Sequence, residues 1–516
     1  MFRLGSDQLT AGKALQILGG RLKGTITEET GRLIRLSHDV VLDIAEGTKA
    51  IYGINTGFGP LCTTVIDRRD TGELQRNLLL SHSVGVGQPI DKELSKLMLI
   101  LKVHALARGY SGVSPEVIER ILWHIQEDII PVVPEQGSVG ASGDLAPLAH
   151  LFLPLIGEGK VFRKNTIRQA GEVLRELGVA PLHLEPKAGL ALINGTQFML
   201  SHAVRLVDEL HNCLSHADLI AAMMLEGLTG SEMPFHEALH RTRPYKGNIH
   251  VAARMHRFLE GSEIIASHAN CDRVQDPYSL RCIPQVHGSS RNAWLHLKET
   301  VETELNSVTD NPVLLPGGLT ISGGNFHGQP LALPVDYACL AAAELGSISD
   351  RRTYLSLEGR APGTPKLLLE STGLNSGFMI LQYVSAALVS ENKSLCFPAS
   401  ADSIPTSLGQ EDHVSMGSIG VRKALTVCRN LVKILAVELV CAAQAYDFRK
   451  PLKSGLTVEA VHQHIWKSIP HADKDRIFSC DIEKAVELIE SRQLTEIVRQ
   501  LNPSPISEFD ELFETY

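Results

Sequence analysis

Three consecutive residues, Ala141, Ser142 and Gly143, have the types and the crowding that a backbone needs to react with itself. They lie in the segment GSVGASGDLAPLAH (137–150), which has three glycines in its first seven positions. Glycine tolerates a very close approach of one peptide unit to another. If the Gly143 nitrogen is pressed onto the Ala141 carbonyl carbon, a five-membered ring can close. Loss of two waters, one carrying away the Ser142 hydroxyl, then leaves an exocyclic methylidene. An amide nitrogen normally shares its lone pair with its own carbonyl, and loss of that resonance makes the methylidene an electrophile.

The same three residues also fit a plain Gly/Ser turn before a helix, so the interpretation depends on partners elsewhere. Tyr52 lies in the glycine-rich loop IYGINTGFGPLCTT (51–64). A tyrosine has a pKa of about 10 in water, so it can act as a base only in a charged, enclosed site. Tyr278 and Arg281 are three residues apart and can share one face of a helical turn. The guanidinium is a planar fork suited to a carboxylate. If these residues have no catalytic role, Tyr52 is an aromatic residue packed within a loop and Arg281 is an ordinary surface arginine.

Three further positions offer polar groups from different parts of the chain. The pair Ser81-His82, in LLLSHSVGVG, supplies a hydroxyl and an imidazole, although most of the 21 histidines must be structural. Asn194 precedes a glycine in LINGTQ, which is also a strong turn dipeptide. Glu411, in GQEDHVSMG, can accept an N–H, or it can simply favour a helix N-terminus.

Taken together and in order, these motifs resemble those of the aromatic amino acid ammonia-lyases, most closely the members that act on histidine. The resemblance covers nearly the whole chain from about residue 8. It implies that residues 141–143 form 4-methylidene-imidazol-5-one (MIO), and that no metal or dissociable cofactor is required. It also implies that Tyr52 is the catalytic base, that Arg281 and Asn194 hold the substrate carboxylate, and that Glu411 lies near the substrate ring.

The resemblance further implies how the substrate side chain is recognised. In relatives that prefer tyrosine the Ser81-His82 position reads His-Leu, and in those that prefer phenylalanine it reads Phe-Leu, so Ser-His indicates an imidazole. Gln197 and Gln275 are expected to add hydrogen bonds. The expected catalytic residues are Tyr52, Ala141, Ser142, Gly143, Tyr278 and Glu411, and the expected substrate-binding residues are Ser81, His82, Asn194, Gln197, Gln275, Arg281 and Phe326.

Helical periodicity indicates the elements that must position these groups. Five long runs carry apolar residues at helical spacing, several of them on more than one face, as expected for buried helices. They are 198–230, 291–306, 331–357, 376–396 and 414–447. Ser114 and Pro115 predict the start of a shorter helix. Loop-like islands at 274–288, 306–330 and 397–417 interrupt the helical part.

The resemblance implies a mainly α fold of the aspartase/fumarase type, with a long central helical bundle and a smaller N-terminal domain. We expect residues 1–195 to carry the lid loop and the MIO segment, residues 196–450 to form the bundle, and residues 451–516 to pack on it as short helices. The resemblance also implies a homotetramer whose active sites draw on more than one chain.

Composition limits the partners. Of the 516 residues, 44% are hydrophobic and 21% charged, as in an ordinary globular protein. The net charge of −9, with no basic block, argues against nucleic acid or an anionic membrane as partner. The N-terminus resembles neither a signal nor a transit peptide. The nine cysteines include no CxxC pair, so we expect a reduced, cytoplasmic protein with a small-molecule substrate.

The expected reaction is elimination of ammonia from L-histidine to give trans-urocanate. The alternatives are an MIO-dependent tyrosine or phenylalanine ammonia-lyase, an aminomutase, and a catalytically silent helical scaffold. Two positions depart from the family pattern: Phe397 stands where histidine is expected, and His287 stands where methionine is common. Either can be a packing difference or can reshape the pocket for the substrate ring.

Overall fold

The computed structural model describes residues 1–47, 50–57, 59, 66–164, 166–269 and 273–516. The chain divides into two compact units, each built from three stretches. Unit 1 comprises Met1–Arg205, Lys298–Asp336 and Pro398–Arg422, and unit 2 comprises Leu206–Leu297, Tyr337–Phe397 and Lys423–Tyr516. The predicted division at residues 195 and 450 remains a prediction.

Unit 1 combines short helices with small sheets. Helices α3, α6 and α8 contact one another, and α4 packs on both α1 and α5. The helices confined to this unit are α1 (Ala11–Leu18), α2 (Glu28–Glu46), α3 (Thr71–His82), α4 (Lys92–Leu106), α5 (Pro115–Gln126), α6 (Leu145–Phe152), α7 (Ala170–Glu176) and α8 (Ala188–Ile193).

The described strands all lie in unit 1 and are short, with two to four residues each. Strand β1 (Phe2–Arg3) pairs in parallel with β2 (Gly24–Thr25), whereas the other pairings are antiparallel. These are β3 (Val86–Pro89) with β5 (Pro134–Gln136), the sheet of β4 (Ile130–Pro131), β6 (Lys160–Arg163) and β7 (Thr166–Gln169), and the hairpin of β8 (Val313–Leu315) and β9 (Leu319–Ile321). Such short strands hold loops in place and do not form a central sheet.

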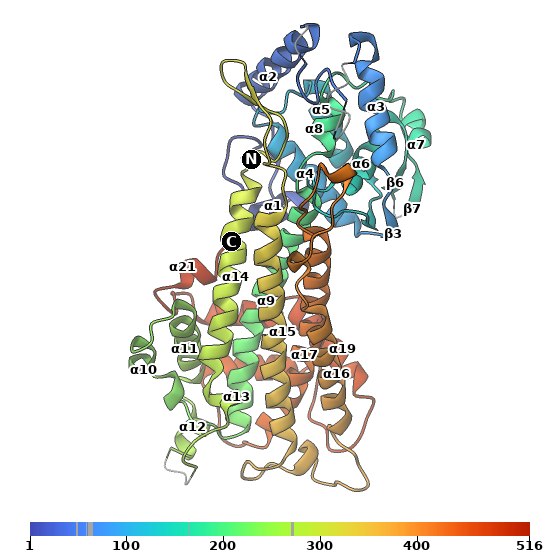
Figure 1. Ribbon diagram of the computed structural model, residues 1–516. Helices are drawn as coiled ribbons and strands as arrows, with labels where there is room; N and C mark the ends of the chain where they lie inside the picture. The colour runs from blue at the N-terminus through green and yellow to red at the C-terminus, as the bar shows by residue number, and fades with distance from the viewer. Residues whose placement is uncertain (48–49, 58, 60–65, 165, 270–272) are drawn as a thin grey trace. The chain divides into compact units, whose positions relative to one another are not determined.

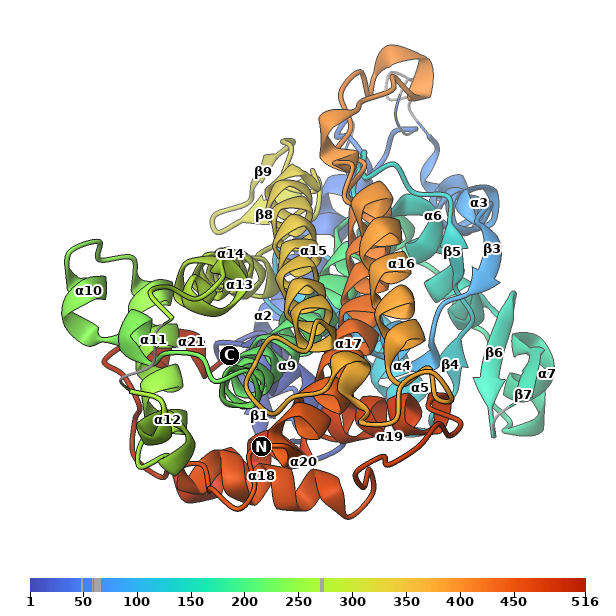
Figure 2. The ribbon, with the colours of Figure 1, turned by 90° about the horizontal axis from the view of Figure 1, so that it is seen from below.

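Long helices make up the core of unit 2, where segments of five of them run side by side (Figures 1 and 2). They belong to α9 (Gln197–Gly227), α14 (Ile283–Leu305), α15 (Gln329–Leu357), α16 (Met379–Leu395) and α17 (Gly417–Asp447). Polar contacts join the apolar faces: the indole Nε1 of Trp294 donates to the Val207 carbonyl (2.8 Å), and Asn430 donates to Asn392 (3.0 Å).

Shorter helices accompany these segments within unit 2. Helix α11 contacts α10 and α18, and α20 contacts α18 and α19. Their bounds are α10 (Glu237–Arg241), α11 (Lys246–Leu259), α12 (Glu263–Ser267), α13 (Tyr278–Arg281), α18 (Leu456–Trp466), α19 (Ser479–Glu490), α20 (Gln493–Leu501) and α21 (Asp510–Phe513).

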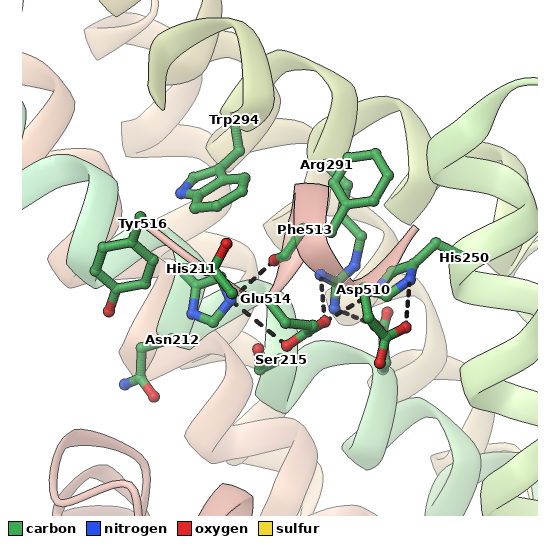
Figure 3. A network of polar contacts seen from close by, with 12 residues as sticks. His211, Asn212, Ser215, His250, Arg291, Trp294, Asp510, Phe513, Glu514 and Tyr516 are labelled. Atoms are coloured by element: carbon green, nitrogen blue, oxygen red, sulfur yellow. Dashed lines mark hydrogen bonds and ion pairs between the residues drawn. The ribbon is translucent and has the colours of Figure 1, made fainter. Parts of the chain in front are cut away.

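Within unit 2, a largely buried ionic network ties the last residues of the chain to the long helices α9 and α14. Figure 3 shows Glu514 between Arg291 and His250; its carboxylate lies 3.2 Å from the guanidinium and 2.8 Å from the imidazole. The guanidinium of Arg291 also contacts the buried carboxylate of Asp218 (2.6 Å). Burial alone would raise the pKa of Glu514, but nearby arginines hold it well below its usual range. Glu514 therefore stays ionised and neutralises buried positive charge.

The predicted mainly α fold is confirmed, and the five long helical runs coincide closely with α9, α14, α15, α16 and α17. The predicted start of a helix at Pro115 is also correct, but the Ser114 side chain makes no capping hydrogen bond. The helical turn expected at Tyr278 and Arg281 is present as α13 (Tyr278–Arg281), but the loop-like interpretation of the island at 274–288 is wrong for its last part, because α14 begins at Ile283. Prolines and polar residues concealed the helical periodicity there.

One helix, α15, is long and apolar enough to cross a membrane by length and composition. However, 67% of its most apolar window is buried inside the structure. Core helices of globular proteins pass the same test, so this feature is explained by packing.

Candidate active site

A cavity of about 610 Å³ in unit 1 brings together six of the predicted site residues. They come from loops and helix ends that are far apart in the sequence. The six are Tyr52, Ser81, His82, Ser142, Asn194 and Glu411. Aliphatic side chains cover much of the remaining wall, namely Ile66, Leu74, Leu78, Leu145, Leu190, Ile193 and Leu408. A few polar groups in an apolar cleft are typical of a small-molecule site.

The hydroxyl of Ser142 donates a hydrogen bond to Oε1 of Glu411 at 2.9 Å. The other carboxylate oxygen of Glu411 accepts hydrogen bonds from the hydroxyls of Thr406 (2.8 Å) and Ser407 (3.0 Å). Three hydroxyl donors therefore fix the orientation of this carboxylate. The group that ring formation would expel is held at the edge of the cavity.

The backbone at Gly143 lies very close to the backbone of Gly195. Gly143 has φ +75° and pairs with Gly195 in an isolated bridge, and the next residue, Asp144, donates its N–H to the Gly195 carbonyl (2.8 Å). A Cβ on Gly143 would lie only 2.1 Å from that carbonyl oxygen. The side chain of Ala141 is buried beside Val414 and Met416. Only glycine fits at position 143.

Asp144, the residue after Gly143, anchors the Ala-Ser-Gly segment through hydrogen bonds of its carboxylate. Its carboxylate is fully buried and accepts from the Met199 N–H (2.9 Å) and the Ser138 hydroxyl (3.1 Å). Burial raises the pKa of Asp144 to about 7, although these hydrogen bonds favour the charged form. The carboxylate thus connects the residue after the Ala-Ser-Gly segment to the start of α9.

Ser81 and His82 lie at the end of α3, with 3.0 Å between the serine Oγ and the imidazole Nδ1. Partial burial lowers the pKa of His82, and the negative charge of Glu411 opposes this shift. His82 is therefore neutral near pH 7 and offers one donor and one acceptor nitrogen.

Tyr52 and Asn194 line the same cavity from two different turns. The Tyr52 hydroxyl oxygen lies 3.4 Å from the Gly59 nitrogen, which donates to it. Asn194 follows α8, and its side-chain amide donates to the Asn311 carbonyl (2.9 Å). The remainder of the predicted lid loop, at residues 58 and 60–64, lies outside the described residues.

Gln197 and Phe326 belong to unit 1 but do not appear among the residues that line the cavity. The Gln197 amide is buried and donates to the Thr309 hydroxyl at 3.2 Å. Phe326 is half-buried in the turn that precedes α15. Their predicted contacts with the substrate remain predictions.

Gln275, Tyr278 and Arg281 belong to unit 2. The predicted helical turn is present as α13, and the Arg281 guanidinium lies 4.6 Å from the centre of the Tyr278 ring. Tyr278 is 71% exposed, and Gln275 is exposed as well. The Nε of Arg281 is buried without a hydrogen-bond partner among the described residues. A buried donor of this kind is suited to an incoming acceptor such as a carboxylate.

Sequence reasoning missed several residues that shape the cavity. Thr406 and Ser407 orient Glu411, and Asn77 lines the cavity from α3. Ser407 and the adjacent Leu408 have positive φ angles of 50° and 56°. A non-glycine residue in this conformation is strained and is often found at functional sites. The sequence alone gives no indication of this backbone conformation.

A mainly α fold with long helices, and an Ala-Ser-Gly segment whose serine lines a cleft, are the features expected of an amino acid lyase. The chain belongs to the aromatic amino acid lyase family, whose model matches residues 9–467.

Among individual relatives, the chain is 44% identical over 494 residues to histidine ammonia-lyase of Myxococcus xanthus, with 96% of this chain and 97% of that protein covered. Solved structures agree. Histidine ammonia-lyase from Trypanosoma cruzi superposes with a TM-score of 0.91 at 38% identity, covering 99% of this chain and 97% of that one. Tyrosine aminomutase from Streptomyces globisporus gives 0.91 at 33% identity, covering 98% and 100%.

The two departures from the family pattern both lie in unit 2. His287 is fully buried on α14, and its Nδ1 lies 2.8 Å from the Asp218 carboxylate while its Nε2 lies 3.2 Å from the Arg352 guanidinium. The His287 imidazole is therefore part of a buried network of charged side chains in unit 2. Phe397 follows the end of α16 and is 79% exposed.

Proposed function

We propose that this enzyme is a carbon–nitrogen lyase that eliminates ammonia from L-histidine without oxidation and releases trans-urocanate. The observation that carries the proposal is the meeting of Ser142, His82 and Glu411 at one cavity. An imidazole and a carboxylate are suitable partners for a substrate imidazole, which has one donor and one acceptor nitrogen. The similarity to histidine ammonia-lyases over almost the whole chain supports the same substrate.

We propose further that residues 141–143 mature into MIO. The residues fit that group, because Gly143 is pressed against the Gly195 carbonyl and the Ser142 hydroxyl lies at the cavity. The mature group supplies an electrophilic carbon that activates the substrate's amine for departure.

The side chains of the protein carry out proton transfer and hold the substrate in position. Tyr52 takes the β-proton on its phenolic oxygen as general base. Asn194 and Arg281 hold the substrate carboxylate, the arginine through its planar fork. His82 and Glu411 orient the ring, and Glu411 accepts its N–H. Apolar side chains on the wall keep water away from these polar contacts.

Three of the proposed site residues, Gln275, Tyr278 and Arg281, lie on an exposed segment of unit 2. The exposure of Gln275 and Tyr278 and the unpartnered Nε of Arg281 support a site completed by assembly into a homotetramer with shared active sites. Exposed Tyr337, Leu340 and Tyr354 on α15, and Ile380 and Tyr383 on α16, also support an extensive interface. We propose a cytoplasmic location, with neither nucleic acid nor membrane as partner.

A second candidate is an aminomutase, which would return the amine to the β-carbon. The similarity to a tyrosine aminomutase over nearly the whole chain favours considering it. Ser81-His82 and Glu411 argue against a substrate with a phenol or phenyl ring, because neither ring needs both an imidazole and a carboxylate as hydrogen-bond partners.

The test supplies histidine, phenylalanine and tyrosine separately, follows the absorbance of the unsaturated acid, and separates the products by chromatography. We expect urocanate and ammonia from histidine, with much slower turnover of the other two substrates. Accumulation of a β-amino acid would replace the lyase with the aminomutase. Failure to turn over any of the three substrates would refute both.

A further inference from the structure

A fully buried lysine lies behind the cavity wall and has no part in the proposed reaction. Lys102, on α4, is 2% exposed. Its Nζ donates to the main-chain carbonyl of Asn194 and lies 3.5 Å from Oε1 of Gln197. Lysine is almost never buried without strong partners, because its charge loses hydration. Such a costly position indicates that these contacts serve a purpose.

The nearby carboxylate does not account for this lysine. Asp310 is paired with a second buried lysine, Lys187, at 2.6 Å. Burial lowers the pKa of Lys102 to about 7, and the charge of Asp310 opposes that shift only in part. The direct contacts of Lys102 go instead to the two residues that flank the dipeptide Gly195-Thr196.

Those contacts fix the wall against which the reactive segment is pressed. The Gly195 carbonyl accepts the Asp144 N–H (2.8 Å) and occupies the space that a side chain on Gly143 would need. Asn194 and Gln197 lie on either side of it, and Lys102 holds both. Loss of Lys102 would leave the Asn194 carbonyl without this donor and let the wall move away from Gly143.

Resting on the proposed function, we infer that Lys102 is a positioning residue for formation of the MIO ring. In that step the Gly143 nitrogen bonds to the Ala141 carbonyl carbon. The carbonyl oxygen leaves as water with the amide hydrogens of Gly143 and Ser142, and a C=N bond forms between the Ala141 carbon and the Ser142 nitrogen. The Ser142 Cα hydrogen and hydroxyl leave as a second water. Lys102 touches none of the reacting atoms. It acts by keeping the Gly195 carbonyl in place, so that the segment stays compressed.

The test measures intact mass for the wild type, Lys102→Met and Lys102→Arg after each purified chain is shown by circular dichroism to be folded. We expect the wild type to lack the mass of two waters. Folded Lys102→Met should be predominantly linear, at least tenfold less mature after equal incubation. Lys102→Arg should recover most of the maturation, because it restores a charged donor. A fully mature Lys102→Met would overturn the inference.

A matched control is Lys187→Met, which also removes a fully buried lysine of unit 1 but one bonded to a side chain. It should lose stability and still mature. Equal loss of maturation in both folded methionine variants would assign the effect to general disturbance and overturn the inference. If Lys102→Met does not fold, Lys102→Gln takes its place, because its shorter side chain cannot reach the Asn194 carbonyl. Failure of both to fold would assign Lys102 to folding and also overturn it. A wild type that keeps both waters would instead refute the proposed function.

Discussion

Replacing Gly195 by alanine tests whether a compressed backbone creates the reactive group. Gly195 has φ +126°, a conformation that residues with a Cβ rarely adopt. The new Cβ would lie 2.5 Å from Oε1 of Gln197 and 2.8 Å from the Thr309 hydroxyl. Both side chains are buried, and Nε2 of Gln197 donates a hydrogen bond to the Thr309 hydroxyl. They must therefore shift, and the Gly195 carbonyl must shift with them.

The expected destabilisation combines two costs. Backbone strain of about 1–3 kcal/mol adds to an overpacking cost of about 1–3 kcal/mol, so unfolding should become easier by about 2–6 kcal/mol. The matched control is Gly178→Ala, in the same unit, with φ +67° and no atom within 4 Å of the new Cβ. It should show only the cost of backbone strain.

Two measurements are needed: the free energy of unfolding in denaturant, and the fraction of folded chains that lack two waters. Gly195→Ala should be less stable than Gly178→Ala and poorly matured, while Gly178→Ala should mature like the wild type. If Gly195→Ala equals the control in both, the Gly195 carbonyl does not compress the segment and the structural reasoning is wrong.

Three further outcomes are expected. Ser142→Ala should fold and bind substrate but lose elimination, because it has no hydroxyl to expel; near-normal turnover by the purified variant would contradict this. Replacing Ser81-His82 by Phe-Leu should lower kcat/KM for histidine at least tenfold more than for phenylalanine, and equal losses would remove this pair from ring recognition. Glu411→Gln removes the negative charge that raises the pKa of His82 against its burial. The acid limb of the kcat/KM profile should therefore move to lower pH, and a shift to higher pH would show that the sign is wrong.

The sequence by itself determined the long helices and indicated the chemistry that we propose for this chain. Ala141-Ser142-Gly143 supplies the atoms from which the proposed ring can close, and the long helices follow from the spacing of their apolar residues. The residue types at Tyr52, His82 and Glu411 suggested one site, but spacing along the chain could not show that they meet.

Only the tertiary structure decided which groups touch. Ser142 and Glu411 are 269 positions apart, yet they share a hydrogen bond. The burial of Lys102 against the Asn194 carbonyl and the role of Gly195 as a wall depend on how α4, α8 and α9 pack. His287 likewise departs from the family pattern in sequence, and only the buried partners Asp218 and Arg352 explain it. Local periodicity records which face of a helix is buried, but contacts between distant segments arise only when those faces pack together.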